Sequence, residues 1–189
     1  MNRSFLLQSN PVLSRRGALT GTLLSASAVA LLAGRDALAA NTAGNAEGDA
    51  RILNTALAAE FEAVAAYQVG AESGLLSKPT LAVALQFQGH HKEHAQALAA
   101  AVSKLGGTPA AKKDKYAFAV DKLKNEADVL RFAAGLERGA VAAYLGAVPV
   151  FQDRTLAQVA ASILGDEAMH WAVLRNALGE APVPTPFMS

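Results

Sequence analysis

Three glutamates lie in the middle of otherwise apolar, helix-like stretches of this sequence. They are Glu60, Glu137 and Glu167. A carboxylate in an apolar core costs several kcal/mol unless a counter-charge accompanies it or a proton neutralises it. Since all three fall at a similar level of their stretches, we predict that two divalent cations compensate them together.

The histidines of the chain are grouped at the same level. Residues three apart share one face of a helix, so Glu167 and His170 present a carboxylate and an imidazole side by side. His91 and His94 present two imidazoles in the same way, whereas the neighbouring His90 and Glu93 turn toward solvent or the flanks. Taken alone, each of these residues is better explained as an ordinary core histidine or a half-exposed glutamate than as a metal ligand. Their joint agreement predicts metal ligands at Glu60, His91, His94, Glu137, Glu167 and His170.

Four helical patterns position these residues. Apolar side chains recur at helical spacing over 53–71, 79–105, 130–148 and 156–177, and in each pattern Glu or His interrupts the apolar stripe near its middle. Pro79, Gly106, Pro149 and Gly179 mark boundaries. The first and last pairs have short connections, while 106–126 is long enough to cross a bundle. We predict an all-α, antiparallel four-helix bundle of two helical hairpins joined by a long crossover.

An internal repeat links the first and third patterns. The spacing between Glu60 and Tyr67 is the same as that between Glu137 and Tyr144. The string Ala-Val-Ala-Ala precedes the tyrosine in both copies. Two interpretations of the tyrosines stay open. They are either amphipathic core residues whose hydroxyls find a partner, or functional residues that relay electrons or donate hydrogen bonds to the metal ligands.

Composition and charge exclude several classes of function. The hydrophobic fraction of 52% is carried mainly by helix-forming Ala and Leu, and the chain contains no cysteine. Disulfides, thiolate catalysis and cysteine-held iron are therefore excluded. The formal net charge is +1, and most of the excess cations lie near the N-terminus. The rest of the chain lacks the clustered cations that nucleic-acid binding requires.

The N-terminal forty residues predict export. Arg15 and Arg16 precede an apolar stretch, and Ala37-Leu38-Ala39 fits a cleavage site, which together resemble a twin-arginine signal peptide. A general secretory signal is the alternative. The predicted organisation is a signal peptide over 1–39, a linker over 40–50, the bundle over 51–179 and a Pro-rich tail over 180–189. We expect a periplasmic protein that meets the twin-arginine translocase during export and keeps no stable membrane anchor after cleavage, because the apolar stretch is short.

The pattern of ligands resembles the ferritin-like superfamily, especially rubrerythrin- and bacterioferritin-type bundles and small exported bacterial ferritin-like proteins. That pattern is Glu on the first helix, Glu-x-x-His on the second, Glu on the third and Glu-x-x-His on the fourth. Matching positions here are Glu60, His94, Glu137, Glu167 and His170, and Tyr67 sits where many members place a tyrosine. His91 departs from the pattern, because it replaces the second-helix glutamate.

The resemblance implies a dinuclear centre of iron, or of iron and manganese, with oxygen- or peroxide-linked redox chemistry. His94 and His170 would each hold one ion, Glu60 and Glu137 would cap or bridge, and Glu167 would bridge. With three carboxylates, two divalent ions would leave a net charge of about +1. An enzyme of this kind would need an external electron donor unless it disproportionates peroxide.

The departure at His91 keeps other functions open. A mononuclear or mixed site is one alternative, and a non-enzymatic, stress-associated bundle with a degenerate or structural metal site is another. An iron-storage cage is less favoured, since the leader and the Pro-rich tail show no cage-forming surface. We expect a homodimer or a monomer.

Overall fold

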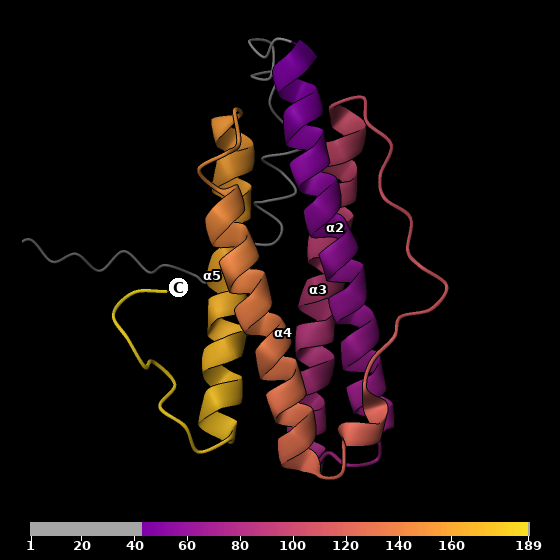
Figure 1. Ribbon diagram of the computed structural model, residues 1–189, viewed down its shortest axis with the longest axis vertical. Helices are drawn as coiled ribbons and strands as arrows, with labels where there is room; N and C mark the ends of the chain where they lie inside the picture. Colours follow the sequence, from indigo (N-terminus) through magenta and orange to yellow (C-terminus); the bar gives the residue numbers. More distant parts are fainter. Residues whose placement is uncertain (1–42, 189) are drawn as a thin grey trace, which may run out of the picture.

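The computed structural model describes residues 43–188 and contains four long α-helices (Figure 1). They are α2 (Ala43–Glu72), α3 (Lys78–Lys104), α4 (Glu126–Ala147) and α5 (Arg154–Ala177). α2 and α3 form one antiparallel hairpin and α4 and α5 form the other, and α2 packs against α4 between them. The predicted all-α bundle of two hairpins is confirmed. The predicted signal peptide and the first residues of the linker lie outside the described residues.

The helix ends follow local sequence rules. Asn125 accepts a hydrogen bond from the Asp128 amide (3.0 Å), and Asp153 accepts one from the Thr155 amide (2.7 Å), so each side chain caps the helix that follows it. Gly106 and Gly179 adopt left-handed φ values of 78° and 75° just after α3 and α5. These caps fix where α4 and α5 begin and where α3 and α5 end.

The first helix begins earlier than we predicted. Residues 43–50 were expected to be linker because they are small, polar and contain glycine, but they form the first turns of α2. Asp49 is 1% exposed and accepts hydrogen bonds from the amides of Gln152 (2.9 Å) and Asp153 (2.8 Å). Tertiary contact with the α4–α5 loop therefore outweighs the weak helix propensity of this segment.

Asp49→Ala is expected to destabilise the protein by about 2–4 kcal/mol, because it leaves two amide donors without their charged acceptor. Urea unfolding followed by circular dichroism would measure this. Glu47→Ala is the matched control, since Glu47 pairs with Arg51 on the same helix at the surface and should cost under about 0.5 kcal/mol. Equal effects of the two substitutions would contradict the role of Asp49.

The long connection runs along the outside of the α2–α3 hairpin and returns the chain to the end where α2 and α3 meet (Figure 1). Its start is fixed by Asn54 on α2, which donates to the Thr108 carbonyl (2.9 Å) and accepts from the Ala110 amide (2.7 Å). A short 3-10 helix, η2 (Val120–Lys122), lies near its end. The predicted crossover is confirmed, and it makes α4 run parallel to α3.

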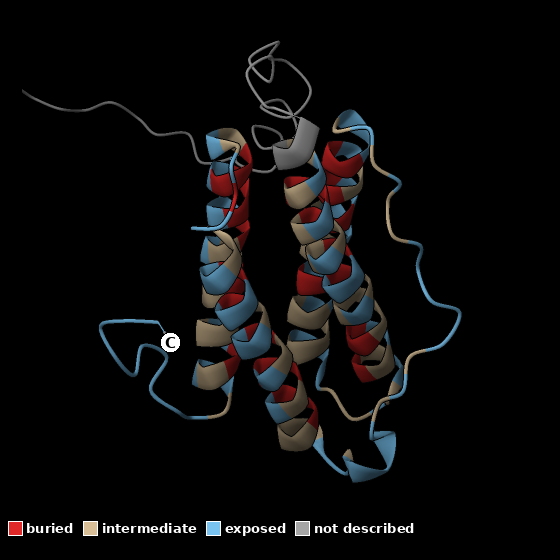
Figure 2. Ribbon diagram, turned by 45° about the horizontal axis from the view of Figure 1, so that its top comes forward, coloured by how far each residue is buried: buried red, intermediate tan, exposed pale blue. Residues whose placement is uncertain are grey.

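Two apolar clusters fill the core on either side of a polar layer. One contains Leu57, Leu98 and Ile163, and the other contains Phe87 and Leu174. The residues of the polar layer fall between these clusters on every helix, and the buried faces point inward (Figure 2). No helix in residues 43–188 is long and apolar enough to span a membrane.

Candidate metal centre

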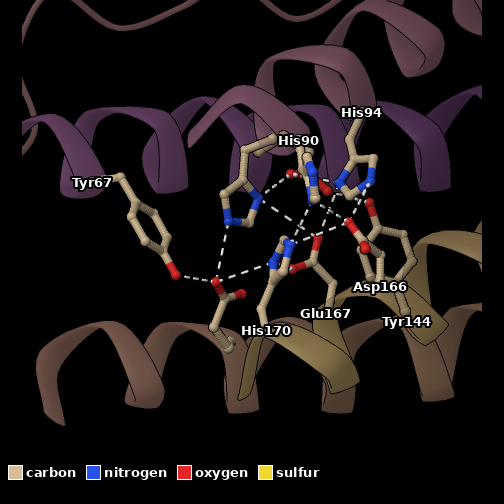
Figure 3. A network of polar contacts seen from close by, with 10 residues as sticks. Tyr67, His90, His94, Tyr144, Asp166, Glu167 and His170 are labelled. Carbon is tan, nitrogen blue, oxygen red and sulfur yellow. Dashed lines mark hydrogen bonds and ion pairs between the residues drawn. The ribbon is translucent and has the colours of Figure 1, made fainter. Parts of the chain in front are cut away.

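The structure brings all six predicted ligands together in the polar layer (Figure 3). α2 and α4 each supply one glutamate, and α3 and α5 each supply a pair of residues three positions apart. His94 is partly buried and the other five are buried. The six are Glu60, His91, His94, Glu137, Glu167 and His170.

Four of these residues form a first group of converging atoms, which we call the Glu60 group (Glu60, His91, His94 and Glu167). Glu60 Oε2 lies 2.8 Å from His91 Nδ1 and 3.6 Å from His94 Nδ1. Glu167 Oε1 lies 3.1 Å from His94 Nδ1 and 3.6 Å from His91 Nδ1. Two carboxylate oxygens and two ring nitrogens therefore face one point.

A second set, the Glu137 group (His91, Glu137, Glu167 and His170), lies beside the first. Glu137 Oε1 is 3.3 Å from His91 Nε2 and 3.4 Å from His170 Nδ1. Glu167 Oε2 is 3.2 Å from His170 Nδ1. Glu167 thus contributes one oxygen to each group.

Both groups fit a metal ion. Donor atoms bound at roughly 2.1 Å around a four-coordinate ion lie about 3.4 Å apart, close to the separations of 2.8–3.6 Å found here. In the part of the chain that the structure describes, the buried side-chain atoms with no hydrogen-bond partner are His94 Nδ1 and Glu167 Oε1. A buried polar atom without a partner is costly, and a cation between these two would satisfy both.

His91 faces both groups, one with each ring nitrogen. Its Nδ1 points to the Glu60 group and its Nε2 to the Glu137 group. An imidazole whose two nitrogens face different groups therefore lies between the groups, where the family pattern has a two-oxygen carboxylate. A neutral imidazole can bind an ion through only one of these nitrogens at a time, so the replacement removes one negative charge and allows His91 to serve either group but not both.

The two repeat copies exchange their tyrosines. Tyr67 donates to Glu137 Oε1, and Tyr144 donates to Glu60 Oε1 at 2.7 Å, so each copy's tyrosine serves the other copy's glutamate. They lie at opposite ends of the network (Figure 3). Burial, together with these carboxylates, raises the pKa of both phenols well above the usual value. Both tyrosines are neutral donors that hold the carboxylates, and a redox role for them stays a prediction.

Sequence reasoning missed two residues of the cluster. We expected His90 to face solvent or the flanks, but its Nδ1 lies 2.9 Å from His170 Nε2 and 3.1 Å from Asp166 Oδ2. Asp166 also approaches His94 Nε2 (3.4 Å). One signal was available, because His90 and Asp166 each stand four residues before a predicted ligand, His94 and His170 respectively.

Asp166 supplies the fourth carboxylate that the sequence analysis did not count. With it, four negative charges face the four positive charges of two divalent ions, so the predicted excess of about +1 becomes roughly zero. Because Asp166 contacts the outer nitrogens of His94 and His170, it compensates charge from outside the two inner groups.

The carboxylates differ in how readily they hold a proton. Burial opposes the charge of Glu60, but hydrogen bonds with His91 and His94 lower its pKa to about 2. Burial also opposes the charge of Glu137 and Asp166, and contacts with histidines hold the pKa of both well below the usual range. Burial dominates at Glu167 and raises its pKa.

The histidines compensate this charge when no cation does. Burial favours the neutral ring, but the surrounding carboxylates raise the pKa of His91 to about 9, of His170 to about 11 and of His94 to about 12. Bound cations must displace these protons, so metal binding is expected to weaken as the pH falls.

These pKa values predict how the stability of the metal-stripped protein changes with pH. The lowered pKa values of the carboxylates stabilise the folded protein above pH 4.5, and this contribution is lost as the pH falls toward 2. The raised pKa values of the histidines stabilise the folded protein fully below pH 6.5, and this contribution is lost as the pH rises through 9. The pKa of Glu167 is raised, so its contribution to stability has the opposite sign and partly offsets that of the other carboxylates.

We therefore expect the metal-stripped protein to have its highest melting temperature between about pH 4.5 and 6.5. Thermal denaturation in a chelator across pH 4–10 would test this, with metal-loaded protein as the control. The loaded protein should keep its melting temperature above pH 6.5, because cations replace the protons. A flat profile for the stripped protein would contradict the assignment of charged histidines.

Comparisons with known proteins agree with this architecture. The sequence matches the ferritin-like domain family over residues 48–180. A conserved hypothetical protein from Mycobacterium tuberculosis has a similar structure (TM-score 0.65, 20% identity, 77% of this chain and 99% of that chain covered). So does a protein from Bacteroides fragilis described as a dodecameric thioferritin related to bacterioferritin (TM-score 0.60, 21% identity, 82% and 93% covered).

At these identities the two structures show a shared fold alone, and no curated protein matches the sequence. The family match includes α3, α4 and α5, all of α2 from residue 48 onward, and every residue of the cluster. Fold, family match and the buried cluster of glutamates and histidines agree, and the chain belongs to the ferritin-like domain family.

Proposed function

We propose that this protein binds a pair of divalent ions, iron or iron with manganese, in the Glu60 and Glu137 groups and uses them in oxygen- or peroxide-linked redox chemistry. The observation that supports the proposal most strongly is a pair of buried atoms, His94 Nδ1 and Glu167 Oε1, which make no hydrogen bond and lie 3.1 Å apart inside a set of four converging donors. When bound, such ions would supply Lewis acidity and electrons.

The protein's own groups would orient and balance this centre. Tyr67 and Tyr144 fix Glu137 and Glu60 through hydrogen bonds, so each carboxylate has one oriented oxygen. Phe87 stacks on His170 with ring centroids 4.0 Å apart and holds the plane of that ring. Protons displaced from the histidines on loading can leave through the partly exposed Asp166.

A cavity between α2 and α4 supports access by a small molecule. Its lining includes the exposed residues Ala59 and Ala143 together with the buried residues Glu60, Glu137 and Tyr144. The cavity therefore joins the protein surface to the cluster. Most of the remaining lining residues are small, so the passage suits dioxygen or peroxide.

Gly139→Leu tests this passage. Gly139 lines the cavity on α4, and a Cβ atom added there meets no atom within 4 Å. Gly146→Leu is the matched control, because Gly146 lies on the same helix with equal room but outside the cavity lining. Both changes should stabilise the helix by about 0.5–1 kcal/mol. Only Gly139→Leu should slow peroxide consumption, by about tenfold, with metal content unchanged; equal rates would rule out this route.

Export and partners belong to the same proposal. We propose that the twin-arginine translocase delivers the protein to the periplasm, where an external electron donor reduces it. Self-association is also proposed, as a homodimer. The Bacteroides fragilis neighbour is described as dodecameric, so multi-angle light scattering of the mature protein should separate a dimer from a larger assembly.

The competing proposal is a non-enzymatic, stress-associated bundle whose metal site is degenerate or structural. The replacement of the pattern glutamate by His91 favours it. The test is elemental analysis of protein exported through its own leader, followed by stopped-flow mixing of the reduced, loaded protein with hydrogen peroxide. About two iron or manganese ions per chain and rapid oxidation support the enzyme. Two ions without oxidation favour a structural metal site, and a folded protein without tightly bound ions excludes the enzyme and leaves the bundle with a degenerate site.

A further inference from the structure

A third set of donor atoms lies on the outer side of the cluster, between α3 and α5. This outer group consists of His90, Asp166 and His170. His90 Nδ1, Asp166 Oδ2 and His170 Nε2 form a triangle with sides of 2.9, 3.1 and 3.2 Å. His94 Nε2 stands next to it, 3.4 Å from the same Asp166 oxygen.

The triangle has the dimensions of a facial metal site. Three donors at right angles around an ion at roughly 2.1 Å lie about 3.0 Å apart, which agrees with the observed sides. Two imidazoles and one carboxylate are also the ligand types of the 2-His-1-carboxylate arrangement. The outer group thus provides one face of ligands and leaves other positions to water.

The side chains of the outer group are more exposed to solvent than those of the inner groups. The side chains of His90 and Asp166 are 34% and 23% exposed, whereas those of Glu137 and Glu167 are 1% and 0% exposed. His170 belongs to both regions, since its Nε2 faces the outer group and its Nδ1 faces the Glu137 group. One ring therefore touches both the exposed and the buried donors.

We propose that His90, Asp166 and His170 form a third divalent-metal site, which captures an ion from solvent and passes it to the Glu137 group. This inference rests on the proposed function, because it assumes that the inner groups receive ions. A neutral imidazole binds a metal through one nitrogen at a time, so the outer and inner positions compete for His170. An ion loses its outer ligand as the inner site takes up the same ring.

Charge makes the outer site the weaker one. Four carboxylates balance two inner divalent ions, and a third ion leaves two uncompensated positive charges in the cluster. Exposure to water reduces this penalty without removing it. The outer ion is therefore bound more loosely than the inner pair and exchanges with solvent.

Cobalt(II) is the probe for this site, because its visible absorption reports ligand number and type. The full-length mature protein, stripped with a chelator, would be titrated with Co²⁺ at equilibrium and mixed with Co²⁺ in a stopped-flow instrument. The test variant is His90→Ala, and the matched control is Glu93→Ala, an exposed residue on the same helix. Circular dichroism would confirm that both variants fold.

We expect wild type and Glu93→Ala to bind two ions tightly and a third weakly. The third ion would be held by His90 and Asp166 with water, because His170 serves the inner site in the fully loaded protein. His90→Ala should bind the same two tight ions, lose the third and fill the inner sites about tenfold more slowly. Wild-type loading rates and three ions in His90→Ala would overturn the proposal. Loss of the tight ions in His90→Ala would also overturn it, by placing His90 in the inner site.

The result also separates this inference from the proposed function. If the inner groups bind no metal, wild type should still show one weak, His90-dependent Co²⁺ ion at the outer group; the proposed function and the transfer step then fail, and the outer site stands. If two tight ions bind with no effect of His90→Ala, the proposed function stands and the outer site fails. Asp166→Asn provides a second variant and should reproduce the loss of the third ion.

Discussion

Glu167→Gln is expected to remove both inner ions at once. Glu167 gives Oε1 to the Glu60 group and Oε2 to the Glu137 group, so a single carboxylate serves both. Glutamine keeps the shape but offers one neutral oxygen and an amide that cannot bind a cation. Affinity for each ion should fall by at least about 100-fold, measured by elemental analysis after dialysis.

Single-group variants provide the comparison. Glu60→Gln should weaken only the ion of the Glu60 group and leave about one ion per chain, and Glu137→Gln should do the same for the Glu137 group. Glu62→Gln, an exposed neighbour on α2, should leave both ions bound. Two ions retained in Glu167→Gln would contradict its shared position.

The stability of stripped Glu167→Gln protein separates lost ligation from lost folding. Glu167 is 0% exposed, and burial raises its pKa despite its contacts with His94 and His170, so its charge is unfavourable in the stripped protein. Replacing it with a neutral amide removes a costly buried group, so the stripped variant should be as stable as stripped wild type or more stable by about 1 kcal/mol. A large loss of stability would show that Glu167 holds the fold together without metal.

His91→Glu is the second change with a large expected effect, because it restores the carboxylate of the family pattern. In stripped protein it places another acid beside Glu60, Glu137 and Glu167 and removes a histidine that carries a proton at neutral pH. The stripped variant should lose about 3–5 kcal/mol of stability. Loading with divalent ions should recover most of the loss, so the increase in melting temperature on loading should exceed that of wild type.

His91→Gln is the control for charge. Glutamine also removes the imidazole but adds no negative charge, so its stripped form should be less destabilised than that of His91→Glu. Differential scanning calorimetry would give the melting temperature of each variant in its stripped and in its loaded form. Equal destabilisation of the two stripped variants would show that lost packing, and not charge repulsion, dominates at this position.

Much of the fold and part of the candidate site could be predicted from the sequence. Helical spacing places Glu60, His91 and Glu167 on buried faces, and the structure finds all three buried. The short and long connections predict two hairpins and a crossover, because connection length limits which helices can be antiparallel neighbours. Both features depend on residues near one another in the chain. The spacing within one helix shows its buried face, and the length of a connection shows which helices can be neighbours.

Other features depend on how separate helices meet. His90 and Asp166 lie at the edges of their helical faces, and only the approach of α3 to α5 brings them within 3.1 Å. The start of α2 at Ala43 depends on Asp49 meeting the distant α4–α5 loop.

The sequence by itself determined the number of helices, their pairing and the level at which six ligands meet. The tertiary structure decided which atoms face each other. Each ring nitrogen of His91 faces a different group, and each tyrosine bonds the glutamate of the other repeat. The physical reason is that residue spacing fixes direction around one helix axis, whereas contacts between atoms depend on the rotation and separation of helices far apart in the chain.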